Sequence, residues 1–136
     1  MADDTPKKKI LVVDDELGIL TLLKASLIKN GYDVMVGHNG LEALASVRQS
    51  LPDLIIIDRM MPKMDGLKAS ALLKADKRFC RIPIIMLTAS AEAEDQKLSQ
   101  EAGADAFLNK PVDITALLQK IQELLAFSWG AGVKVY

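Results

Sequence analysis

Three short apolar runs constrain the fold of this chain more than any other feature. They lie at residues 10–13, 53–58 and 83–88, and isoleucine, leucine and valine fill most of their positions. A continuous apolar run of this length is typical of a strand that is covered on both faces of a sheet. Residues 32–36 and 105–108 are shorter and weaker strand candidates.

Helical patterns alternate with these strand candidates. The five helical stretches lie, in chain order, at residues 20–27, 39–47, 65–73, 91–102 and 114–125. Asn39 and Asp113 stand at N-cap positions, and Gly31 and Gly103 follow two of the stretches as stop signals. Strands that alternate with helices predict an α/β fold, with a five-stranded parallel sheet and helices on both faces.

The pattern extends over one domain, which we expect to cover residues 8–126. Residues 1–7 are predicted to be an N-terminal tail. Residues 127–136 contain two glycines and are predicted to be a C-terminal tail or a linker stub.

Composition excludes several classes of function. The 17 Lys and Arg residues balance 18 Asp and Glu residues, so the chain lacks the basic excess of a protein that binds nucleic acid directly. No run approaches the roughly 20 apolar residues of a membrane span, which predicts no membrane insertion. A single cysteine, Cys80, cannot form an internal disulfide, and this favours a cytoplasmic location.

Polar residues capable of chemistry follow four of the strand candidates. Asp14 and Asp15 follow the run at residues 10–13, and Asp58 ends the run at 53–58. Thr88 ends the run at 83–88, and Lys110 follows the run at 105–108. Each of these residues alone is an ordinary turn or strand residue. Ligands of open parallel sheets bind beyond the carboxyl ends of the strands, so we expect the five side chains to converge there.

The residue types predict phosphoryl transfer with a divalent cation. Three clustered carboxylates repel one another and require a cation, and oxygen ligands suit Mg²⁺. A carboxylate can attack phosphorus to form an aspartyl phosphate. Mg²⁺, the Lys110 ammonium and the Thr88 hydroxyl could then each take one phosphoryl oxygen.

The sequence resembles a two-component response-regulator receiver domain, of the kind found as single-domain chemotaxis regulators. The motifs that carry the resemblance are residues 10–16 (ILVVDDE), 58–66 (DRMMPKMDG), 88–89 (TA) and 109–111 (NKP). They span nearly the whole of residues 8–126. The resemblance implies a flavodoxin-like (βα)5 fold with strand order 2-1-3-4-5, an order that the spacing alone does not give.

The resemblance also implies roles for the acidic residues. Asp58 matches the phosphoacceptor of the family. Asp15, Asp58 and the backbone carbonyl of Met60 would ligate Mg²⁺, and Asp14 would act mostly through metal-bound water.

Further roles fall on residues of the last two strands. Lys110 would bind the phosphoryl group, and the Lys110–Pro111 peptide bond would be cis. Thr88 would be the switch hydroxyl, and Phe107 occupies the position of the switch aromatic residue.

The implied partners are proteins. A sensor histidine kinase or a phosphotransfer protein would donate the phosphoryl group, and an unknown downstream protein would read the switched surface. We expect a monomer or a phosphorylation-dependent dimer, with no independent turnover of a small molecule. The stand-alone receiver is slightly favoured over the receiver part of a longer regulator.

Three other functions stay open at this stage. One is a receiver-like domain that is never phosphorylated. Another is a phosphatase similar to the haloacid-dehalogenase family, but Met60 stands where that family carries its second aspartate. The third is a flavodoxin-like cofactor carrier, but Asp14 and Asp15 stand where a phosphate-binding loop is needed and would repel phosphate.

Four side chains near these motifs receive no chemical role. His38 is expected at the surface, Cys80 is expected to be an inert loop thiol, and Met61 and Met64 are expected to pack beside the acidic residues.

Overall fold

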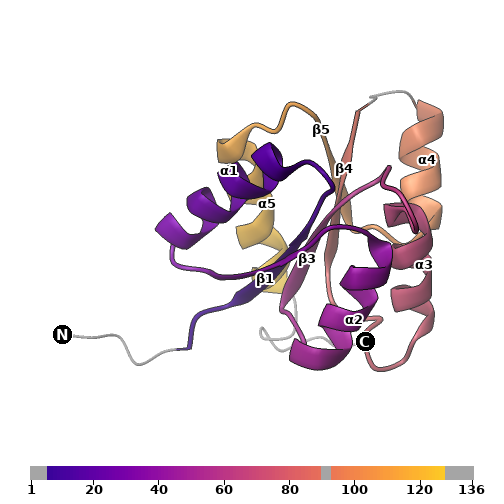
Figure 1. The fold of residues 1–136 in the computed structure, drawn as a ribbon, viewed down its shortest axis with the longest axis horizontal. Helices are drawn as coiled ribbons and strands as arrows, with labels where there is room; N and C mark the ends of the chain where they lie inside the picture. The colour runs from indigo at the N-terminus through magenta and orange to yellow at the C-terminus, as the bar shows by residue number, and fades with distance from the viewer. Residues whose placement is uncertain (1–5, 90–92, 128–136) are drawn as a thin grey trace.

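A computed structural model describes residues 6–89 and 93–127 of the chain, and in that part five strands alternate with five helices (Figure 1). The strands are β1 (Lys9–Val13), β2 (Asp33–Gly37), β3 (Leu54–Asp58), β4 (Ile84–Thr88) and β5 (Ala106–Asn109). The helices are α1 (Leu17–Lys29), α2 (Gly40–Ser50), α3 (Gly66–Ala75), α4 (Ala93–Glu101) and α5 (Ile114–Phe127).

The five strands form one parallel sheet in the order β2-β1-β3-β4-β5. Helices α1 and α5 cover one face, and α2, α3 and α4 cover the other (Figure 1). The predicted α/β class, the helices on both faces and the strand order are confirmed. Because β1 and β3 lie side by side while their connections run to opposite edges, the carboxyl ends of these two strands form the crevice where ligands bind in such sheets.

The three central strands are buried because each supplies side chains to both faces of the sheet. Alternate residues point to opposite faces of a strand. Leu11, Ile55 and Ile84 join the core beneath α2 and α3. Ile10, Leu54 and Ile85 join the core beneath α1 and α5. The continuous apolar runs of the sequence thus fill two cores, one on each side of the sheet.

The helix starts agree with the caps that the sequence predicts. The Asn39 side chain accepts a hydrogen bond from Glu42 N at 2.9 Å, and Asp113 Oδ1 accepts one from Ala116 N at 3.2 Å. In a capping box the Glu42 carboxylate would accept a hydrogen bond from the backbone N–H of Asn39. Here it accepts one from His38 N at 3.0 Å, one residue earlier. His38 is about half exposed, as expected for a surface residue.

Small boundary shifts separate prediction from structure. Strand β2 begins at Asp33 rather than at residue 32, and β5 runs from Ala106 to Asn109. Gly31 and Gly103 both have φ of +92°, which suits the stop positions predicted for them. The start predicted for the fourth helix, residue 91, lies outside the described residues, as do most of the two predicted tails.

Within the described ranges, no helix is both long and apolar enough to cross a membrane.

Candidate functional site

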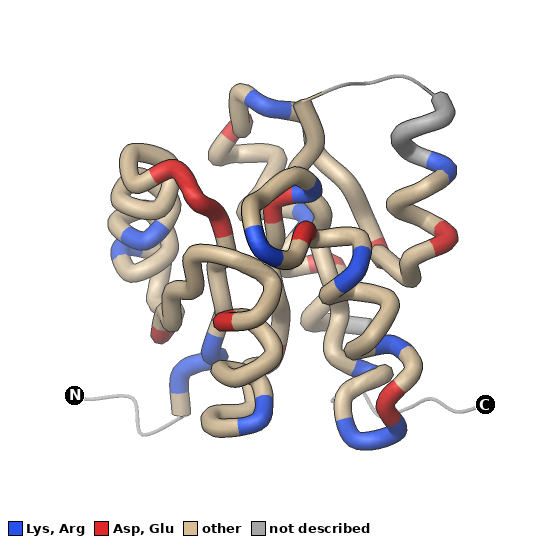
Figure 2. Tube along the Cα trace, turned by 45° about the vertical axis from the view of Figure 1, so that its right-hand side comes forward, with Lys and Arg blue, Asp and Glu red and all other residues tan. Residues whose placement is uncertain are grey.

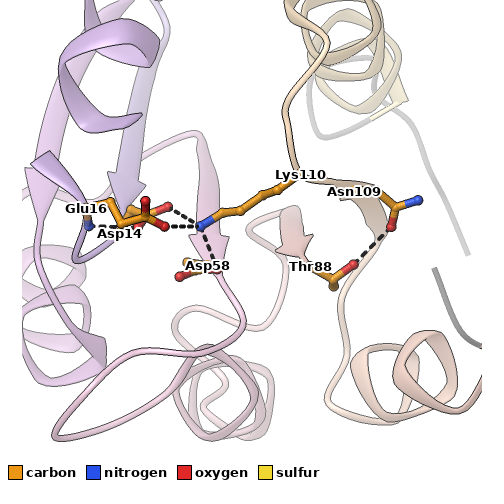
Figure 3. A network of polar contacts seen from close by, with 6 residues as sticks. All are labelled: Asp14, Glu16, Asp58, Thr88, Asn109 and Lys110. Atoms are coloured by element: carbon orange, nitrogen blue, oxygen red, sulfur yellow. Dashed lines mark hydrogen bonds and ion pairs between the residues drawn. The ribbon is translucent and has the colours of Figure 1, made fainter. Parts of the chain in front are cut away.

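The carboxyl ends of four strands bring the candidate site residues to one edge of the sheet. Asp14 follows β1, Asp58 is the last residue of β3, Thr88 is the last of β4, and Lys110 follows β5. Figure 3 shows the Lys110 side chain reaching from the end of β5 toward the acidic residues. The structure therefore brings Asp14, Asp58 and Lys110 together, although they are far apart in the sequence. Thr88 lies at the same edge of the sheet, but its hydroxyl contacts Asn109.

The Lys110 ammonium is the centre of this group. Its Nζ atom lies 3.0 Å from Asp14 Oδ2, 3.2 Å from Asp58 Oδ1 and 3.3 Å from Glu16 Oε1. Asp14 is fully buried and Asp58 is only 6% exposed, so both carboxylates depend on neighbouring groups in place of water. One ammonium thus serves three carboxylates.

Burial sets the acidity of the phosphoacceptor candidate. Loss of water around Asp58, followed by the negative charge of Asp14, raises its pKa from 3.8 to about 6, although Lys110 opposes the shift. The pKa of Lys110 is raised above its ordinary value, because hydrogen bonds and charge interactions with Asp14 and Asp58 outweigh the effect of its burial. Lys110 therefore stays positively charged, whereas the surroundings of Asp58 disfavour its ionised form.

The same carboxylates form a group that suits a hard metal ion. Asp14, Asp15 and Asp58 each offer one oxygen, and these oxygens lie within 4.8 Å of one another. Asp14 Oδ2 is buried, and its ion pair with Lys110 Nζ at 3.0 Å places it beside a charge that is shared with Asp58 and Glu16. Three carboxylates against one ammonium leave an excess of negative charge. An all-oxygen donor set with excess negative charge fits Mg²⁺.

An open cleft gives ligands access to this group. Its volume is about 410 Å³. The residues that line it are Asp15, Glu16, Asp58, Arg59, Met60, Ala89 and Lys110. Figure 2 shows the acidic residues that follow β1 as one continuous stretch beside the start of α1. The Met60 side chain is 68% exposed, so it stands at the surface of the cleft.

The loop between β3 and α3 is held against the start of α2. Gly40 N donates a hydrogen bond to Met64 O at 2.8 Å. A Cβ atom at Gly40 would lie 2.6 Å from that oxygen and 2.7 Å from Met64 Cγ, so only glycine allows this approach. A Cβ atom at Gly66 would collide with the carbonyl of Asp58. Two glycines therefore fix the loop that follows Asp58 and carries Met60, and Met61 and Met64 pack against the core beside it.

The two candidate switch residues lie on neighbouring strands. Thr88 is 1% exposed, and its hydroxyl donates a hydrogen bond to Asn109 Oδ1 at 3.1 Å. Phe107 is half-buried and packs against the core beneath α2 and α3. The Lys110–Pro111 peptide bond is cis, as the resemblance implied.

Sequence reasoning missed two residues of the site. Glu16 contacts Lys110, and Asn109 contacts Thr88. Glu16 directly follows Asp14 and Asp15, and Asn109 directly precedes Lys110, so adjacency to a named site residue was the available signal. Cys80 lies away from the cleft and donates a weak hydrogen bond to Lys77 O at 3.8 Å.

Comparisons with known proteins agree with this geometry. The sequence model of the response regulator receiver domain family matches residues 10–122. The alkaline phosphatase synthesis transcriptional regulatory protein PhoP of Bacillus subtilis is 42% identical over 118 residues, which are 87% of this chain and 48% of PhoP. The chain thus spans about half the length of the curated relatives it matches.

Solved structures show the same fold. The chemotaxis response regulator CheY4 of Vibrio cholerae is 31% identical with a TM-score of 0.83, over 88% of this chain and 99% of CheY4. The receiver domain of the sensor histidine kinase PA1611 from Pseudomonas aeruginosa is 30% identical with a TM-score of 0.83, over 89% of this chain and 99% of that domain. That domain has a magnesium ion coordinated in its active site cleft.

Proposed function

Because the chain belongs to the response-regulator receiver domain family of two-component systems, we propose that it accepts a phosphoryl group on Asp58. The observation that carries this proposal is the position of Asp58, which lies 3.2 Å from the Lys110 ammonium and beside the carboxylates of Asp14 and Asp15. No other aspartate in the described part of the chain ends a strand within this cleft.

The proposed step is a displacement at phosphorus. One oxygen of the ionised Asp58 carboxylate forms a bond to the phosphorus atom of the donor. The bond from phosphorus to the donor's nitrogen or oxygen breaks, and its electron pair leaves with the donor. Asp58 must be ionised to act, and its pKa of about 6 lets it keep its charge at neutral pH.

The acidic residues would hold the cation that this step needs. Asp15, Asp58 and the backbone carbonyl of Met60 are the proposed direct ligands of Mg²⁺, and Asp14 would hold its water. Bound Mg²⁺ supplies positive charge beside the transferred phosphoryl group. The negative excess of the group and the closeness of its three carboxylates support this ligand set.

Lys110 would act on the phosphoryl group as a fixed positive charge. Its ammonium lies 3.2 Å from Asp58 Oδ1. A small movement would therefore bring it to an oxygen of a phosphoryl group attached to Asp58. Thr88 and Phe107 would form the switch that transmits phosphorylation of Asp58 to the surface formed by α4, β5 and α5. A downstream protein would then read that surface.

The donor and the output are proposed at the level of class. A phosphohistidine of a sensor kinase or phosphotransfer protein would supply the phosphoryl group, in keeping with the family. The output is a protein contact, with no direct binding of nucleic acid by residues 8–126. A cytoplasmic location and a monomer or phosphorylation-dependent dimer stay predictions. A receiver that is part of a longer regulator remains the alternative to a stand-alone one, since PhoP is about twice as long as its matched region.

Intact-protein mass spectrometry after incubation with acetyl phosphate tests the proposed function. Wild type should gain one phosphoryl group with Mg²⁺ and none with a chelator. Asp58→Asn should gain none. Asp65→Asn is the matched control, because it changes an aspartate of the same loop while keeping a side-chain oxygen for the α3 cap. Equal labelling of the Asp58→Asn and Asp65→Asn proteins would contradict the assignment, and an unlabelled wild type would favour a domain that is never phosphorylated.

A further inference from the structure

The switch hydroxyl has a specific partner at the end of the neighbouring strand. Thr88 and Asn109 are register partners as the last residues of β4 and β5. Thr88 Oγ1 donates to Asn109 Oδ1 at 3.1 Å. Figure 3 shows the Asn109 oxygen turned toward Thr88 and the amide nitrogen turned away from it.

This contact competes with the role proposed for Thr88. A hydroxyl has one hydrogen, so it can give one strong hydrogen bond at a time. A phosphoryl oxygen on Asp58 would need that same hydrogen. Thr88 can therefore donate a hydrogen bond to the phosphoryl group on Asp58 only after its hydrogen bond to Asn109 has broken.

The two neighbouring residues Asn109 and Lys110 point to different partners. Lys110, the next residue after Asn109, points to Asp58. Asn109 instead holds the Thr88 hydroxyl toward β5, and Figure 3 shows this pair on the far side of the Lys110 side chain from Asp14 and Glu16. The two adjacent residues thus contact two different parts of the site.

From this geometry we propose that Asn109 is a latch that holds the Thr88 hydroxyl in its resting position. The proposal rests on the proposed function, because it assumes a phosphoryl group on Asp58. Asn109 acts through Thr88 and is a positioning residue. Its side chain is exposed, so water can take its place when the hydroxyl leaves, and the latch is weak enough to be opened. A net hydrogen bond of this kind changes an equilibrium by about two- to tenfold.

Titration with beryllium fluoride in the presence of Mg²⁺ tests the latch, because this complex mimics a phosphoryl group without covalent chemistry. Asn109→Ala removes the acceptor, and Asn109→Leu removes it while keeping a similar volume. Both variants should bind the mimic about two- to tenfold more tightly than wild type. In a Thr88→Val background, which lacks the hydroxyl, the same substitutions should change the apparent Kd less than twofold.

The outcomes separate this inference from the proposed function. If wild type binds the mimic and the Asn109 variants bind it equally or more weakly, the latch is wrong and the phosphoacceptor site stands. If the variants bind more tightly to the same extent in the Thr88→Val background, Asn109 does not act through the hydroxyl, and the latch is again wrong. If wild type fails to bind the mimic with Mg²⁺, both the latch and the proposed function are overturned.

Discussion

At the residue scale, the charge on Asp58 determines what the site can do. The side chain is nearly inaccessible to water and lies beside Asp14, and these two effects raise its pKa to about 6. Lys110 lowers that pKa but does not restore its ordinary value. The proposed nucleophile therefore lies in surroundings that disfavour its ionised form.

The raised pKa predicts a pH-dependent stability. Asp58 binds its proton more tightly in the folded chain than in the unfolded chain, whose pKa is near 3.8. The folded state therefore loses stability as pH rises from about 4 to about 7, by an amount on the order of 2 kcal/mol. Without Mg²⁺, Asp58→Asn should be more stable than wild type at pH 7, and the difference should shrink toward pH 4.5. Urea unfolding of both proteins across this range measures it, and a difference independent of pH would contradict the assigned cause.

Met60 predicts a long-lived phosphoryl group. Its side chain is exposed at the cleft, and its sulfur is only a weak hydrogen-bond acceptor. It therefore cannot firmly position the water molecule that hydrolyses the aspartyl phosphate by in-line attack on phosphorus. Met60→Asn should lose its phosphoryl group several-fold faster than wild type. Mg²⁺ affinity should change little, because the proposed contact uses the backbone carbonyl. Loss of labelled phosphate after donor removal measures the rate, and equal or slower loss in Met60→Asn would show that hydrolysis is limited elsewhere.

At the element scale, the start of α2 positions the loop between β3 and α3. Gly40 and Met64 are in such close contact that a methyl group cannot enter between them. Gly18 of α1 is the matched control, because a Cβ atom there would meet nothing within 4 Å.

These two glycines predict opposite results. Gly40→Ala should destabilise the fold by about 1–3 kcal/mol and weaken Mg²⁺ binding, because the loop that follows Asp58 and carries Met60 must shift. Gly18→Ala should be neutral or stabilising by up to about 1 kcal/mol, with Mg²⁺ binding unchanged. Chemical unfolding and calorimetric titration of Mg²⁺ measure both. Equal Mg²⁺ affinity in the two variants would show that α2 does not position the site.

Burial explains which elements the sequence predicted well. Strands β1, β3 and β4 are central and buried on both faces, so their apolar runs are continuous and their ends are marked by Asp14, Asp58 and Thr88. Strands β2 and β5 lie at the edges of the sheet and are only partly buried, so their patterns are weaker. Both ends of these two strands were predicted one residue too early, whereas the central strands differ by one residue at their starts alone. The contacts of Glu16 and Asn109 depend on side-chain direction across elements, which no spacing in the sequence reveals.

At the scale of the whole molecule, the order of the strands brings the site together. Spacing predicted five βα units but could not tell which strands are neighbours, and that knowledge came from the family resemblance. With β1 and β3 side by side at the centre, their carboxyl ends place Asp14 and Asp58 together, and β5 brings Lys110 to them.

This arrangement predicts that Mg²⁺ stabilises the whole fold. A ligand that binds the native state alone raises stability by mass action, here by relieving repulsion among Asp14, Asp15 and Asp58. Saturating Mg²⁺ at about 100 times its Kd should add roughly 2–3 kcal/mol to the free energy of unfolding. Asp15→Ala should lose most of that gain, because Asp15 is exposed and its loss removes a ligand without opening the core. Thermal melts with Mg²⁺ and with a chelator measure the gain, and a wild type indifferent to Mg²⁺ would contradict the proposed metal site.

Chemical trapping of the phosphorylated residue tests the central claim most directly. Borohydride reduces an aspartyl phosphate to homoserine, which marks the residue that carried the phosphoryl group. After incubation with acetyl phosphate and Mg²⁺, reduction and peptide mass spectrometry should place homoserine at position 58 and leave Asp14 and Asp15 unchanged. Homoserine at position 14 or 15, or none at position 58 in a protein that has gained a phosphoryl group, would contradict the account.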